Sequence, residues 1–71
     1  MTVETPSEKT VITFIKNRAE QNESTASRHI HRRFDVSMEI ADKILARLAE
    51  KKMILEFYDK EYQENRYTLK T

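Results

Sequence analysis

The apolar residues of this chain change their spacing once, near Met53. Before that point they recur every three or four residues, as they do on one face of an α-helix. After it, the segments ILEFY and RYTLK alternate apolar with other residues, which is typical of β-strands. The polar segment DKEYQEN between them is typical of a turn. The sequence therefore predicts helices followed by a two-stranded antiparallel hairpin.

The segment TPSE predicts the start of the first helix. Thr5 is its expected N-cap, Pro6 the first helical residue and Glu8 the capping-box partner. The apolar spacing that follows predicts a helix over residues 6–22. Its apolar face consists of Val11, Ile12, Ile15 and Ala19. Phe14 either widens this face or contacts a partner.

A second, shorter helix is expected over residues 26–34, with either Thr25 or Ser27 as its N-cap. Its buried stripe is predicted from residues four apart, which are Ala26, Ile30 and Phe34. Asp35 is expected to end this helix, because aspartate tolerates turn conformations.

Ser37 predicts the N-cap of a third helix over residues 38–51. The residues expected to be buried on it are Ile40, Ala41, Ile44, Leu45 and Leu48. The hairpin is expected over residues 54–70, with Tyr67 and Leu69 facing the core. The elements describe a single domain over residues 1–71, of the α+β class and mainly helical.

Composition limits the kind of protein. Seventy-one residues are near the lower size for a stable core without crosslinks, and the absence of cysteine removes disulfides and thiolate metal sites. The start, MTVETPSEKT, lacks a signal-peptide pattern, and no apolar run is long enough to span a membrane. We therefore expect a cytoplasmic protein with no membrane partner.

Little in the sequence supports catalysis. There is no glycine for a phosphate-binding loop and no thiol nucleophile, and the carboxylates are spread over helix surfaces. His29 and His31 are two residues apart, so they do not share a helix face, and no third histidine completes a metal site. The protein is expected not to be an enzyme, with no catalytic residues, no metal and no cofactor.

Positive charge is concentrated in one segment. The net charge is only +1, but Arg28, Arg32 and Arg33 lie with two histidines in a run that contains no acid. This run is either an ordinary solvated helix surface or a site for phosphates, and the absence of an acid favours phosphates. Both histidines would gain charge in mild acid, which predicts tighter binding at about pH 6 than at about pH 8.

The segment IHRRFDVSMEIADKILARLAEKKMI resembles the winged helix-turn-helix family of DNA-binding domains. The matching residues are Ile30, Phe34, Val36 and then Ser37, which opens the next helix. The segment NRYTL resembles the closing strand of the wing, which is the family's hairpin. The resemblance covers almost the whole chain, and the compact layout is similar to that of small bacterial transcriptional regulators.

The resemblance implies a transcriptional regulator that binds double-stranded DNA. The third helix would enter the major groove, while the second helix and the wing contact the phosphate backbone. The DNA-binding residues expected on these three elements are Arg28, His31, Arg32, Ser37, Met38, Glu39, Asp42, Lys43, Arg47, Lys60 and Arg66. Because such regulators are commonly dimers, a homodimer through the first helix and an exposed Phe14 is also expected.

Several alternatives remain open. Glu39 and Asp42 either accept hydrogen bonds from cytosine or form surface pairs, such as Glu39 with Lys43. The near-neutral charge and acidic wing also fit a winged-helix module that binds a protein partner through Tyr58 and Tyr62. A third possibility is a protein that binds RNA or single-stranded nucleic acid.

One departure from the family concerns the end of the third helix. Lys52 stands where the family usually has a glycine in the left-handed conformation. Either Lys52 adopts that conformation or the helix ends differently. The tip of the wing also lacks glycine, so Asn65 or Asp59 is expected to take any such conformation there.

Overall fold

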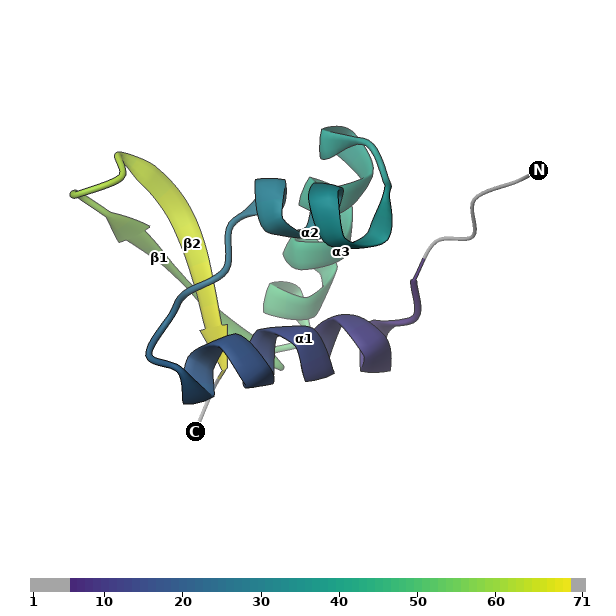
Figure 1. The fold of residues 1–71 in the computed structure, drawn as a ribbon, viewed down its shortest axis with the longest axis horizontal. Coiled ribbons are helices and arrows are strands. Elements are labelled where there is room, and N and C mark those ends of the chain that lie inside the picture. The colour runs from purple at the N-terminus through teal and green to yellow at the C-terminus, as the bar shows by residue number, and fades with distance from the viewer. Residues whose placement is uncertain (1–5, 70–71) are drawn as a thin grey trace.

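The computed structural model describes residues 6–69 and contains three helices followed by an antiparallel hairpin (Figure 1). The elements are α1 (Glu8–Glu20), α2 (Ser27–Phe34), α3 (Met38–Glu50), β1 (Ile54–Asp59) and β2 (Glu64–Leu69). The fold is therefore α+β and mainly helical, with the winged-helix-like layout that the sequence predicts.

A single apolar core joins the helices to the hairpin. Helix α2 packs against α3, and α1 lies against β2 (Figure 1). The largest fully buried apolar side chains are Val11, Ile15, Ile30, Leu45, Leu48 and Ile54. Tyr67 is also buried, as predicted. The prediction for Ile40 was wrong, because it lies beside the buried face of α3 and is 38% exposed.

The helix starts differ from the predictions in two of three cases. Helix α1 begins at Glu8, and Ser7 caps it by accepting a hydrogen bond from the Thr10 N–H at 3.2 Å. Pro6 therefore precedes the helix, and Thr5 lies outside the described residues. The Ser37 cap of α3 is confirmed, since its hydroxyl accepts a hydrogen bond from the Ile40 N–H.

Helix α2 is capped by neither Thr25 nor Ser27. Ala26 is the N-cap residue, and its N–H donates to Nδ1 of His29 at 2.9 Å. Thr25 instead forms an isolated β-bridge with Tyr67 of β2. Its N–H donates to the Tyr67 carbonyl at 2.8 Å, and the Tyr67 N–H donates to the Thr25 carbonyl at 2.7 Å. This bridge fixes the start of α2 against the hairpin.

The chain uses residues other than glycine wherever the backbone needs a positive φ. Lys52 has a φ of 61° after α3, which confirms the left-handed alternative. The Met53 N–H donates to the Leu48 carbonyl, which closes the helix end. At the hairpin tip the positive φ falls on Gln63, not on Asn65 or Asp59 as predicted.

Replacing Lys52 by glycine should stabilise the protein by up to about 1 kcal/mol, because glycine adopts the left-handed conformation without a Cβ clash. Lys52 is exposed, so the substitution removes little packing. Urea unfolding of the Lys52→Gly variant measures the change. A lower unfolding midpoint would contradict the prediction. Lys16→Gly, within α1, is the matched control and should destabilise by about 1 kcal/mol.

Candidate nucleic-acid interface

An open groove of about 550 Å³ lies between the start of α2, the outer face of α3 and the start of β2. Arg28 lines it from α2, and Asn65 lines it from β2. Met38, Asp42 and Ala46 line it from α3, where residues four apart share one face. The structure thus brings the predicted residues Arg28, Met38 and Asp42 together at one groove.

A second exposed row on α3 lies beside this groove and consists of Glu39, Lys43 and Arg47. The Lys43 ammonium lies 3.5 Å from the Glu39 carboxylate, and both side chains are more than 70% exposed. This is the surface pair predicted as one alternative for Glu39. Such exposed pairs contribute at most about 1 kcal/mol, so Lys43 can exchange Glu39 for another anion.

Asp42 has a partner that the sequence analysis did not anticipate. The Ser27 hydroxyl donates a hydrogen bond to its carboxylate, which joins the outer face of α3 to the first residue of α2. The partial positive charge of backbone N–H groups at a helix start also favours a carboxylate there. Asp42 therefore serves as a tether between the two helices.

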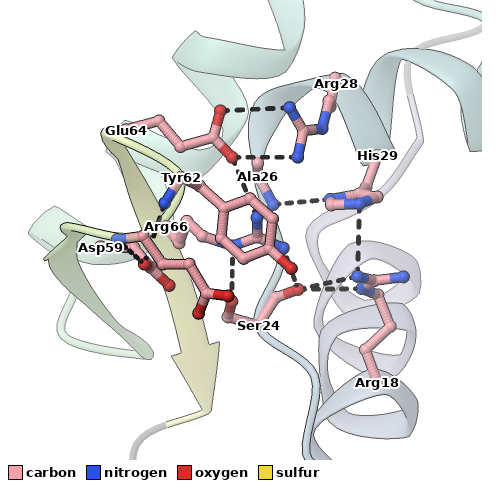
Figure 2. A network of polar contacts seen from close by, with 10 residues as sticks. Arg18, Ser24, Ala26, Arg28, His29, Asp59, Tyr62, Glu64 and Arg66 are labelled. Carbon is pink, nitrogen blue, oxygen red and sulfur yellow. Dashed lines mark hydrogen bonds and ion pairs between the residues drawn. The ribbon is translucent and has the colours of Figure 1, made fainter.

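Arg28 is half-exposed and paired with the hairpin. Its guanidinium lies 3.3 Å from the Glu64 carboxylate (Figure 2), and its Cζ lies over the Tyr62 ring at 5.9 Å from the ring centroid. Arg32 and His31 are exposed on the same helix. Nδ1 of His31 donates to the Val36 carbonyl, which ties α2 to the turn before α3. Arg28 thus borders the groove-lining face of α3, whereas Arg33 lies on the side of α2 that faces Phe14 of α1.

The structure places Arg66 inside the fold, so the phosphate contact predicted for it was wrong. Its side chain is only 5% exposed, and it donates to the Ser24 hydroxyl at 2.5 Å and the Ser24 carbonyl at 3.0 Å (Figure 2). It also pairs with Glu64 at 3.0 Å and lies over the Tyr62 ring. Lys60, by contrast, is exposed at the hairpin tip.

His29 lies among these cations, and its pKa is lowered from the usual 6.5. Burial is the main cause, followed by the positive charges of Arg18, Arg66 and Arg28. Its Nδ1 accepts the Ala26 N–H, which also requires that nitrogen to be unprotonated. His29 therefore resists protonation, contrary to the expectation that both histidines gain charge. The predicted tighter binding in mild acid therefore receives no support from His29.

The lowered pKa of His29 predicts that the folded protein loses stability in mild acid. The unfolded ring binds a proton at a higher pH than the folded ring does. His29 therefore makes its full contribution to stability above about pH 6.5. This contribution falls as the pH drops towards the lowered pKa of the folded ring. Urea unfolding at pH 7.5 and 5.5 measures the decrease in the free energy of unfolding. This decrease should be smaller in the His29→Gln variant. An equal loss in both proteins would contradict this role of His29.

The wall of the groove near β2 is fixed by a second set of hydrogen bonds. The Tyr67 hydroxyl and the Asn65 amide both donate to the Glu56 carboxylate at 3.1 Å. Burial, and secondarily the contact with Glu56, raises the pKa of Tyr67 to about 12. Tyr67 therefore remains a neutral hydrogen-bond donor at physiological pH.

Phe14 widens the apolar face of α1, which is one of the two roles that the sequence predicts for it. Its ring packs edge-to-face against Phe34 at 5.6 Å, and the Arg18 guanidinium lies over it at 5.9 Å. It is only partly exposed. A homodimer through α1 stays a prediction, and the Phe14 proposed for it is partly covered by Phe34 and Arg18.

The chain matches no protein-family model, no curated protein and no solved structure. Within residues 6–69, no helix is long and apolar enough to cross a membrane. The same residues contain no cluster of three or more histidine, aspartate or glutamate side chains that could hold a metal ion.

Proposed function

We propose that this protein is a transcriptional regulator of the winged helix-turn-helix type that binds double-stranded DNA. The observation that carries the proposal is the groove at which Arg28 of α2, the exposed face of α3 and the start of β2 meet. A helix about 10–12 Å wide fits the major groove of B-DNA. Helix α3 would enter that groove, with α2 and the hairpin on the backbone.

The exposed residues of α3 supply different contacts in this arrangement. Met38, which is 44% exposed, can contact a thymine methyl group, and Lys43 can donate to guanine. Arg47 lies one turn further on and can reach a phosphate. Asp42 faces Ser27 of α2, which supports a tethering role rather than contact with cytosine.

Arg28 must exchange Glu64 for a phosphate, and the structure supports a low cost for this exchange. An ion pair this exposed contributes at most about 1 kcal/mol. Glu64 also keeps its second partner, Arg66, at 3.0 Å, so its carboxylate is not left unpaired. Arg32 is exposed and adds a second phosphate contact one turn along α2.

The direct test is fluorescence anisotropy with a mixed-sequence DNA duplex at several salt concentrations, with a single strand as competitor. We expect log K to fall linearly with log salt, because bound phosphates release counterions. The single strand should compete less well than the duplex. Absence of binding, or binding that does not depend on salt, would contradict the proposal. Preference for the single strand would favour the RNA or single-strand alternative.

A winged-helix module for a protein partner is the second candidate. The exposure of Tyr58, at 59%, near the acidic hairpin tip favours it. Tyr62 supports it less, because its ring already stacks with Arg66 at 4.3 Å. NMR shifts confined to residues 58–65 on addition of a partner protein would favour this candidate over DNA binding.

A further inference from the structure

Strand β1 has an open edge. Tyr67 exchanges its backbone hydrogen bonds with Thr25, so they point away from β1. Glu56 lies opposite Tyr67 in the antiparallel pair. Residues opposite each other either both direct their backbone N–H and C=O towards the partner strand or both direct them away from it. The N–H and C=O of Glu56 therefore point away from β2. Because this direction alternates from one residue to the next along a strand, Ile54 and Tyr58 also direct their N–H and C=O away from β2. No segment among residues 6–69 pairs with this edge.

The two acids of β1 do not guard this edge. Proteins usually protect an exposed edge with a charge, a proline or a bulge. The Glu56 carboxylate instead turns across the sheet to Tyr67 and Asn65. The Asp59 carboxylate turns into the hairpin tip, where it accepts the N–H of Glu61 at 2.8 Å. β1 also contains no lysine, proline or glycine.

A row of exposed apolar side chains accompanies the open edge. Leu55 and Phe57 lie on one side of β1 and are 47% and 39% exposed. Met53 precedes the strand and is 43% exposed. An apolar row beside unpaired backbone groups suits the addition of another strand.

We propose that β1 pairs antiparallel with β1 of a second copy of this chain, with the two-fold axis at Leu55. This register sets Leu55 opposite its own copy and Met53 opposite Phe57. A register centred on Glu56 would place two acids opposite each other, and one centred on Phe57 would set Leu55 against Asp59. The Leu55 register therefore matches Leu55, Met53 and Phe57 with one another, and it sets Glu56 opposite Ile54 rather than opposite another acid.

The expected dimer is weak, because a pairing of about five residues buries much less than a standard interface of about 1,600 Å². It makes no use of Arg28, Arg32 or the exposed rows of α3. The dimer and the DNA interface are therefore independent, and either proposal can fail without the other.

Single-cysteine variants test the register, since the protein has no native cysteine. Residues opposite each other across such a pair lie about 4.5–5.5 Å apart at Cα, within the range of disulfides. We would oxidise Leu55→Cys, Glu56→Cys and Phe57→Cys with oxidised glutathione and measure the disulfide dimer by mass spectrometry. Thr13→Cys, exposed on α1, controls for random collision and for a dimer through α1.

We expect Leu55→Cys to form the covalent dimer, of twice the chain mass, faster than the other three variants. Faster crosslinking of any other variant, or equal rates for all four, would overturn the proposal. Sedimentation provides a second measurement that needs no cysteine. The unmodified protein should show a concentration-dependent dimer that Leu55→Lys abolishes while circular dichroism remains unchanged. A dimer that persists in Leu55→Lys would also overturn it.

Discussion

Replacing Arg66 by methionine should lower the free energy of unfolding by about 3 kcal/mol, as expected when one partner of a buried charged network is removed. The substitution removes both hydrogen bonds to Ser24 and the ion pair with Glu64. It also removes the guanidinium that stacks on Tyr62. Urea unfolding at pH 7 measures the effect.

The matched control is Arg32→Met, which removes the same charge from an exposed position and should change stability by less than about 0.5 kcal/mol. At low temperature, where both variants are folded, Arg66→Met should also keep the salt dependence of DNA binding. A small stability change, or a reduced salt dependence in Arg66→Met, would contradict the structural role of Arg66.

Removing Arg28 and Arg32 together should weaken duplex binding about 10- to 100-fold near 100 mM salt. Each phosphate contact contributes about 0.9 to the slope of log K against log salt, so the slope should fall by nearly two. Anisotropy titrations of Arg28→Ala/Arg32→Ala at several salt concentrations measure both quantities.

The matched control is Lys9→Ala/Lys16→Ala, which removes two exposed positive charges from α1 and gives the same net charge. Neither lysine lines the groove beside α3. If both double variants lose the same affinity, the effect comes from overall charge rather than from a phosphate contact by α2.

The features that the sequence predicts well are those set by neighbouring residues. The Ser37 cap and the turn at Asp35 each depend on a few adjacent positions, and the positive φ of Lys52 was one of two alternatives for the helix end. The buried faces of the helices follow equally from local spacing, apart from Ile40. These features were sufficient to predict the order of three helices and a hairpin.

The features that the sequence did not reveal depend on contacts between distant segments. Thr25 looked like a helix cap, but its backbone pairs with Tyr67, 42 residues further on. Arg66 looked like an exposed base, but it reaches Ser24 across the fold. The groove likewise forms only when α2, α3 and β2 meet, so spacing along the chain does not predict its lining.

The most direct test of the account is an NMR titration of the labelled protein with duplex DNA at two salt concentrations. We predict amide shifts confined to α2, the first turns of α3 and the hairpin tip, weaker at the higher salt. Shifts centred on α1, or on the open edge of β1 with α3 unchanged, would contradict the proposal that α3 reads DNA.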